Sequence, residues 1–134
     1  MKYLLDSNAV IALMKGHPGF VNELRRHKPQ DFAIPAIVVH ELFYGAYKGQ
    51  RVSDNLARVD ALQFETLDFD KEDARAAGEI RAGLASLGTP IGAYDVLIAG
   101  QAVARDLILI THNVREFERV PKLRFEDWES SSSG

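Results

Sequence analysis

The chain has 134 residues, of which 46% are hydrophobic and 26% charged, and its formal net charge is −3. This balance is typical of one globular domain, and the mild negative charge argues against a dedicated nucleic-acid-binding module built on basic residues. The chain has no cysteine, which excludes disulfides and thiolate metal sites. Its apolar runs are shorter than the roughly 20 residues that span a bilayer, so we expect a cytoplasmic protein without a signal peptide or a membrane partner.

The predicted elements alternate between strands and helices along the chain. Short apolar runs predict strands at residues 2–6, 31–35, 64–69, 107–111 and 123–128. Helical patterns and turn residues predict helices at residues 7–15, 17–28, 35–49, 53–63, 70–88, 89–106 and 112–120. Ser53 is expected to open the fourth helix, and Leu87 to share the apolar stripe of the fifth. This alternation predicts a three-layer α/β/α domain around a central, mainly parallel sheet over residues 1–129, followed by a flexible polar tail at 130–134.

Polar residues stand where two of the predicted strands end. Asp6 ends the first apolar run, and Thr111 and Asn113 follow the apolar run "LILI". Sites in open α/β sheets lie beyond the carboxyl ends of strands, so these side chains are expected to face one crevice. Asp6 is also a good helix N-cap, so a purely structural role for it stays open.

Two further acids lie on the apolar faces of predicted helices. Glu41 interrupts the apolar stripe of "IVVHELFYG", and Asp95 shares its helical face with Ile98, Ala99 and Ala102. Both acids also have a purely structural interpretation. Glu41 can be a residue at the boundary of the apolar face, and Asp95 can be a first-turn acid that the helix dipole favours.

Together, the three acids predict a metal site. Three carboxylates that converge without a cation repel one another, and the oxygen-seeking ions Mg²⁺ or Mn²⁺ relieve that repulsion. Acids that hold such ions can polarise a phosphate and activate water, which indicates phosphodiester hydrolysis.

The sequence also resembles a known family. The blocks "YLLDSNAVIAL", "VVHELFYGA", "IRAGLASLGTPIGAYDVLIAGQAVARDLILITHNVREFERVP" and "LRFEDW" are similar, in order and spacing, to the PIN-domain ribonucleases, and within them to the VapC-type toxins. The resemblance implies a PIN-like α/β/α nuclease and a metal-dependent endoribonuclease toxin of a type II toxin–antitoxin system. It also implies an RNA substrate, a cognate antitoxin that neutralises the toxin as a hetero-oligomer, and a homodimer as the usual unit.

The resemblance assigns roles to individual residues. It implies that Asp6, Glu41 and Asp95 are catalytic and hold Mg²⁺ or Mn²⁺. Asn113 stands at a fourth catalytic position that is an acid in many relatives, and Ser7 and Thr111 support the site.

Two departures from the family pattern concern Ala93, where relatives often have proline, and Gln101, where they often have histidine. Gln101 puts in doubt any substrate contact that a histidine would make there.

Two rival functions remain open from the sequence. A phosphatase with a strand-end aspartate nucleophile would need a second acid two residues on, where this chain has Asn8. A non-catalytic domain that keeps an acidic metal pocket and only binds a partner is the other alternative.

Overall fold

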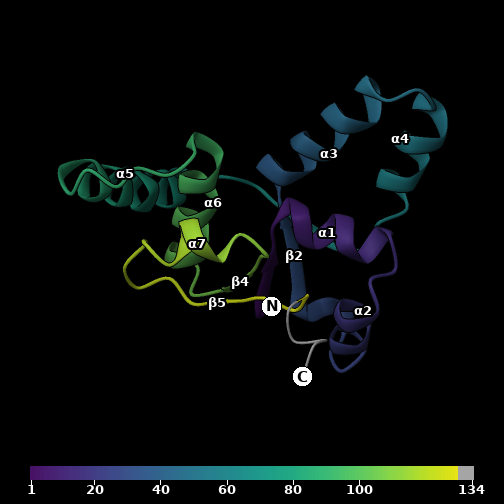
Figure 1. Cartoon of the computed structure of the whole chain (residues 1–134), viewed down its shortest axis with the longest axis horizontal. Helices are drawn as coiled ribbons and strands as arrows, with labels where there is room; N and C mark the ends of the chain where they lie inside the picture. The colour runs from purple at the N-terminus through teal and green to yellow at the C-terminus, as the bar shows by residue number, and fades with distance from the viewer. Residues whose placement is uncertain (130–134) are drawn as a thin grey trace.

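A five-stranded parallel sheet forms the centre of the computed structural model, which describes residues 1–129 (Figure 1). Its strands are β1 (Tyr3–Leu5), β2 (Phe32–Pro35), β3 (Glu65–Leu67), β4 (Ile108–Ile110) and β5 (Phe125–Glu126). They lie in the order β3-β2-β1-β4-β5, and every pairing is parallel. The predicted tail at 130–134 lies outside the described residues.

Helices cover both faces of the sheet. They are α1 (Ser7–Met14), α2 (Pro18–Leu24), α3 (Ala36–Lys48), α4 (Val52–Asp60), α5 (Lys71–Ser86), α6 (Ala93–Ala104) and α7 (Val114–Phe117), and a short 3₁₀ turn, η1 (Pro29–Asp31), precedes β2. Figure 1 shows α1–α4 on one side of the sheet and α5–α7 on the other. The three-layer α/β/α prediction is therefore confirmed. Among the described residues, no helix combines the length and the apolar character that crossing a membrane requires.

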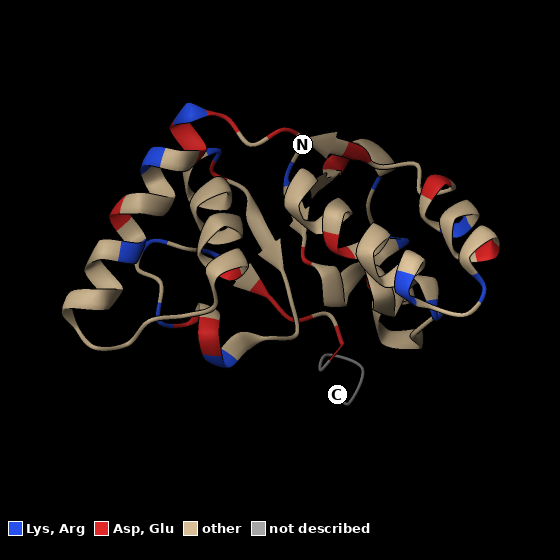
Figure 2. Cartoon of the chain, turned by 90° about the horizontal axis from the view of Figure 1, so that it is seen from above, with Lys and Arg blue, Asp and Glu red and all other residues tan. Residues whose placement is uncertain are grey.

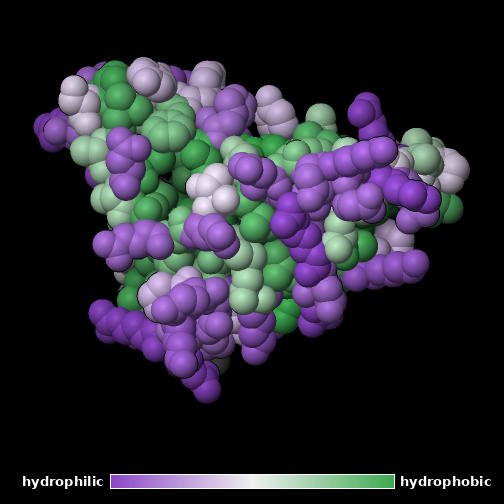
Figure 3. All heavy atoms as spheres, turned by 180° about the vertical axis from the view of Figure 1, so that it is seen from behind, coloured by the Kyte–Doolittle hydropathy of each residue, from purple (hydrophilic) through white to green (hydrophobic). Residues whose placement is uncertain are grey.

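The inner strands β1, β2 and β4 are largely hidden because they are apolar on both faces, whereas the edge strands β3 and β5 keep exposed residues. Tyr3, Leu4, Leu5, Leu109 and Ile110 are at most 4% exposed, as expected for a parallel sheet covered on both sides. On the reverse face of the molecule, Figure 3 shows hydrophobic residues at the surface in patches between hydrophilic side chains.

Helices α5 and α6 approach each other closely at one glycine. A Cβ atom placed on Gly100 would lie 2.5 Å from Ala77 Cβ and 2.6 Å from the Ala77 main chain. Only a glycine at this position lets the two backbones pack at that distance.

Two details of the helix predictions were wrong. Helix α4 begins at Val52 with Arg51 at its N-cap, so Ser53 does not open it. Leu87 is 76% exposed because it follows the last residue of α5, whereas Ala77, Ile80 and Leu84 do form the buried stripe. The end of this helix was predicted correctly, because Gly88 has a φ of +70°, a left-handed conformation that favours glycine.

Candidate active site

The strand register brings Asp6 and Thr111 together. Leu5 on β1 pairs with Ile110 on β4, so the residue that follows each of them reaches the same edge of the sheet. The Thr111 hydroxyl donates a hydrogen bond to Asp6 Oδ2 at 2.9 Å. The two polar strand ends therefore lie side by side, as the crevice prediction requires.

Asp6 is a buried acid with several donors around it. Its side chain is almost fully enclosed, at 3% exposure, and it is the N-cap residue of α1. Besides Thr111, the main-chain amide of Ser7 donates to its carboxylate at 2.8 Å and Asn8 Nδ2 donates at 3.3 Å. Burial raises the pKa of Asp6 in spite of these hydrogen bonds. Asp6 therefore caps a helix and also presents a poorly solvated carboxyl group to the site.

Asn8 is a site residue that the sequence analysis treated only as a missing acid. Its Nδ2 also lies 3.3 Å from Thr111 Oγ1, and its Oδ1 accepts a hydrogen bond from the main-chain amide of His112 at 2.8 Å. Asn8 thus ties the first turn of α1 to the segment after β4. Its place two residues beyond a strand-end acid was the signal that could have identified it.

Glu41 faces Asp6 from α3. It is half-buried, and burial followed by the negative charge of Asp6 raises its pKa. The acid in the apolar stripe therefore contributes to the charge of the same cluster as Asp6.

Asp95 and Glu116 share a hydrogen bond across the other side of the cluster. Burial, this bond and the charges of Asp6, Glu116 and Glu41 together raise the pKa of Asp95 to about 8. The hydrogen bond from Asp95 lowers the pKa of Glu116, which keeps its charge. The opposite directions of the two pKa shifts make Asp95 the donor and Glu116 the acceptor of this hydrogen bond.

Glu116 is the fourth acid of the cluster, and the sequence analysis missed it. Asn113 Nδ2 donates to Glu116 Oε2 at 3.0 Å, and the main-chain amide of Gly92 donates to the same carboxylate. The main-chain N–H of Asn113 donates to Thr111 Oγ1 at 3.0 Å. Asn113, predicted as catalytic, therefore contacts both strand-end Thr111 and the fourth acid. The signal was an Asn and a Glu spaced i, i+3 at the start of a helix that follows a strand end.

The donor set fits a hard divalent cation. Asp6, Glu41, Asp95 and Glu116 supply carboxylate oxygens that raise one another's pKa or share a proton. Such mutual repulsion is what a bound Mg²⁺ or Mn²⁺ relieves, and carboxylate oxygens are the ligands that these ions prefer.

A second group of metal-ligating side chains lies after β4 and β5. One ligand atom each from His112, Asp127 and Glu129 lies within 4.8 Å of the others, and His112 Nδ1 is 3.0 Å from Asp127 Oδ2. The His112 side chain is 59% exposed, whereas Asp127 and Glu129 are partly buried.

Gln101 lies in a buried network between α5 and α6. It is fully buried, and its Nε2 donates to the Asp68 carbonyl at 2.9 Å and to Asp73 Oδ2 at 3.0 Å. Arg105 donates to both carboxylate oxygens of Asp73, and Asp70 and Asp73 form a capping box at the start of α5. Gln101 is therefore a packing residue without access to a substrate.

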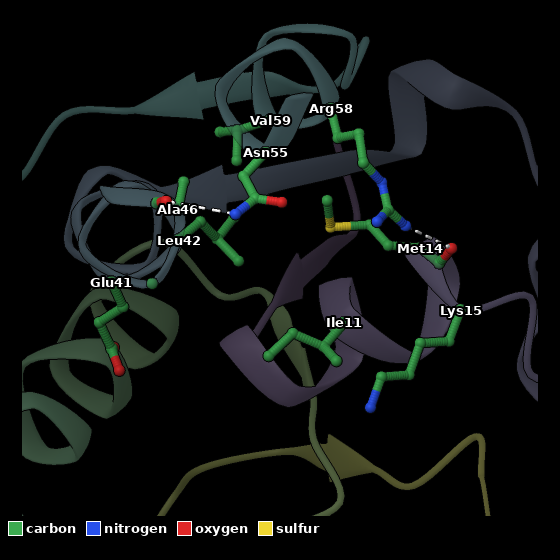
Figure 4. Close-up of a pocket in the computed structure, with 10 residues that line it drawn as sticks. Ile11, Met14, Lys15, Glu41, Leu42, Ala46, Asn55, Arg58 and Val59 are labelled. Atoms are coloured by element: carbon green, nitrogen blue, oxygen red, sulfur yellow. Dashed lines mark hydrogen bonds between the residues drawn. The ribbon is translucent and has the colours of Figure 1, made fainter. Parts of the chain in front are cut away.

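A groove opens beside the acid cluster, between α1, α3 and α4. It has a volume of about 420 Å³, and Figure 4 shows its lining. Ile11, Met14, Leu42 and Val59 give it an apolar surface. In Figure 4, Lys15 and Arg58 lie on its opposite side from Glu41, and Arg58 donates to the Met14 carbonyl at 3.5 Å. The groove thus has an apolar floor, two cations and an edge at the acid cluster.

Comparison with known proteins identifies the family of the chain. Residues 3–123 match the PIN domain. The chain belongs to the PIN-domain family, as the sequence resemblance predicted.

Within the family, the chain is similar to VapC proteins. It is 42% identical over 130 residues to the tRNA(fMet)-specific endonuclease VapC of Salmonella typhimurium, which covers 96% of this chain and 98% of the relative. It is 36% identical over 130 residues to ribonuclease VapC2 of Haemophilus influenzae, with coverage of 96% and 98%.

Solved structures agree with this assignment. The DNA-bound VapBC of Salmonella typhimurium superposes with a TM-score of 0.90 at 42% identity and covers 96% of this chain and 98% of its own. VapBC2 of Rickettsia felis, bound to a DNA fragment from its promoter, has a TM-score of 0.87 at 34% identity, with coverage of 96% and 99%.

Proposed function

We propose that this protein is a metal-dependent endoribonuclease toxin that hydrolyses RNA phosphodiester bonds with Mg²⁺ or Mn²⁺. The observation that carries the proposal is the cluster of four acids at the carboxyl edge of the sheet, in which burial, the hydrogen bond to Glu116 and the charges of the neighbouring acids raise the pKa of Asp95 to about 8. Acids that repel one another in this way destabilise the fold when no cation is bound, and a bound divalent cation would relieve that repulsion.

Asp6, Glu41 and Asp95 would hold the cation, with Glu116 beside them. The bound cation would supply Lewis-acid activation of water and neutralise charge that develops on the phosphate. Thr111 and Asn8 fix the orientation of the Asp6 carboxylate, and the Ser7 amide anchors its other oxygen. Asn113 fixes Glu116 in the same way. These contacts preorganise the acids, as groups around a metal site must.

The proposed substrate is tRNA(fMet) or an RNA of similar shape. The basis is the 42% identity to a relative named as a tRNA(fMet)-specific endonuclease. RNA enzymes of this kind recognise loops whose unpaired bases can leave the stack, so we expect cleavage in a loop.

The proposed partner is a cognate antitoxin, because similar chains are found in VapBC complexes. The groove between α1, α3 and α4 supports this assignment, since its apolar floor fits the apolar face of a peptide segment. Lys15 and Arg58 would pair with acids of that segment. We also propose a homodimer and a cytoplasmic location, and light scattering of the purified toxin and of its complex would test the assembly.

The test of the function is cleavage of a tRNA(fMet) transcript, mapped by end sequencing. The wild-type protein is compared with Asp95→Asn and with Asp106→Asn, each with Mg²⁺, with Mn²⁺ and with chelator. Asp106 is the matched control because its side chain is 92% exposed and pairs only with surface Arg124 in the contacts described.

A discrete, metal-dependent cut that Asp95→Asn abolishes and Asp106→Asn retains supports the proposal. RNA binding without cleavage in every folded sample would instead indicate the non-catalytic domain. Release of phosphate from a simple phosphomonoester with intact RNA would indicate the phosphatase.

A further inference from the structure

Two aromatic rings stand at the rim of the acid cluster. His40 on α3 and Tyr94 on α6 contact edge to face, with ring centroids 5.7 Å apart and planes at 69°. His40 directly precedes Glu41, and Tyr94 directly precedes Asp95, so each ring is next in sequence to an acid of the cluster. The pair bridges the helical layers on either side of the sheet.

These rings are open to solvent. Tyr94 is 51% exposed, and His40 is also exposed. An aromatic pair that served only to join α3 to α6 would gain most from burial, because the stabilisation from such rings comes mainly from removing their surface from water. The exposed faces beside the acids are therefore free to meet a flat ligand.

The aromatic surface continues along α3. Tyr44 lies one turn beyond His40 on the same helix face and is 61% exposed. Lys48 lies a further turn on, with its Nζ 5.3 Å from the centre of the Tyr44 ring. Along α3, the rings of His40 and Tyr44 and then the cation of Lys48 therefore follow one another at intervals of one turn.

This order matches the chemistry of single-stranded RNA. The acids repel phosphates, and Figure 2 shows charges of both signs interspersed along the outer helices α4 and α5 of the described chain. Affinity for RNA must then draw on contacts that are not purely ionic. Unpaired bases stack on aromatic side chains, and a lysine beside such a ring pairs with the phosphate between bases.

We propose that Tyr94, His40 and Tyr44 form a stacking surface that positions unpaired bases of the RNA next to the scissile phosphate, with Lys48 on the backbone beyond them. This inference rests on the proposed function, because it names how the nuclease site holds its RNA. The observation that carries it is the exposed contact between His40 on α3 and Tyr94 on α6, since each ring directly precedes one of the four acids in sequence.

The test distinguishes the contribution of the Tyr94 ring to RNA binding from that of its hydroxyl group and from an effect on folding. Tyr94→Ala, Tyr94→Phe and Tyr44→Ala are compared with wild type, and Leu87→Ala is the control because Leu87 is a large exposed side chain at the end of α5. Steady-state cleavage gives KM and kcat for the tRNA(fMet) transcript. Anisotropy of a labelled transcript in the Asp95→Asn background gives Kd without cleavage.

We expect Tyr94→Ala to raise KM and Kd about tenfold, which is the effect of losing one stacked base. Tyr94→Phe and Leu87→Ala should stay within about twofold of wild type, and Tyr44→Ala should raise Kd by a smaller factor. Circular dichroism and the melting temperature confirm that each variant is folded.

Three results would overturn the inference. Tyr94→Ala could bind as tightly as wild type, or Tyr94→Phe could be as weak as Tyr94→Ala. Light scattering could also show that the alanine variants lose RNA only by dissociating a dimer, which would make the surface an interface between copies. Absence of cleavage by the wild type would contradict the proposed function itself. This outcome is distinct from the other three because it is seen in the wild type without any variant.

Discussion

Two groups of aspartates in this molecule have opposite electrostatics. Asp73, on α5, is 1% exposed, and burial alone would raise its pKa, but hydrogen bonds from Arg105, from the Asp70 amide and from Gln101 outweigh burial and lower it. Asp95, on α6, is also desolvated, but its nearest partners are other acids, and its pKa rises to about 8. Helices α5 and α6 pack on each other and both aspartates are desolvated. Neither the kind of element nor burial therefore explains why their pKa values shift in opposite directions.

The difference lies in whether the chain supplies its own cation. Arg105 reaches Asp73 with two donors, at 3.0 and 3.2 Å, so this acid is already neutralised and holds α5 against α6. Around Asp95, Arg119 helps to lower the pKa of Glu116, but the pKa values of Asp6, Glu41 and Asp95 stay raised because their hydrogen-bond donors do not cancel burial and mutual repulsion. An acid cluster that is oriented without being neutralised is suited to an external cation, which is the distinction between a functional and a structural group of acids.

The largest expected effect is on catalysis. Asp6→Asn should lower kcat for RNA cleavage by at least about a hundredfold, because it removes an oriented charge from the site. Asp70→Asn, a matched change in the structural group, should leave kcat within about twofold. Single-turnover cleavage at saturating protein measures both, and equal losses in the two variants would end the distinction.

Stability should respond in the opposite way. Asp73→Ala should reduce the free energy of unfolding by about 3 kcal/mol, since it leaves Arg105 and buried Gln101 with fewer partners. Urea unfolding at neutral pH measures this loss.

The pH dependence of the Asp73 effect gives an independent check. The contribution of Asp73 is fully present above the ordinary pKa of 3.8 and should fade as the pH falls through its lowered value in the folded protein. A loss that does not change with acidification would show that packing, not charge, is responsible.

Divalent cations should stabilise the folded protein by binding at the acid cluster and not at the His112 group. Mg²⁺ or Mn²⁺ at about one hundred times its Kd should add about 2.7 kcal/mol to the wild type. The gain should be absent in Asp95→Asn and retained in His112→Ala, which removes the only histidine of the second ligand group. Thermal unfolding with and without metal measures it, and a gain lost in His112→Ala would move the cation to that group.

The smallest effect is a gain in stability when a functional acid is removed. Without metal, Asp95→Asn should be more stable than wild type by on the order of 1 kcal/mol at pH 8. The folded protein resists ionisation of Asp95 until about pH 8, while the unfolded chain ionises near 3.8, so wild type loses stability as the pH rises between these values. The difference should vanish near pH 4, and chemical denaturation across this range would reveal a contrary sign.

Much of the fold followed from patterns in the sequence. The sequence predicts β1 and β4 from their apolar runs, because a strand buried on both faces requires apolar residues. It predicts the start of α5 from its capping residues, because only a few residue types cap a helix well. Asp6, Glu41 and Asp95 could be selected because each acid interrupts an apolar pattern.

Glu116 could not be selected in this way. It stands on α7, a helix of four residues with no periodic face, among other charged residues. The i, i+3 spacing of Asn113 and Glu116 indicates their hydrogen bond, but the contact of Glu116 with Gly92 and its approach to Asp95 depend on the tertiary fold. Gln101 shows the same limit, because a polar residue inside an apolar helix pattern gives no indication of its partners.

The strand order has a consequence for how the protein is made. Asp6 and Glu41 come from the first half of the chain, whereas Asp95 and Glu116 come from the second, and β1 can pair with β4 only after residue 110 exists. A product that ends before residue 116 therefore lacks at least one of the four acids. The cluster is therefore complete only late in each round of synthesis, after both halves of the chain have emerged.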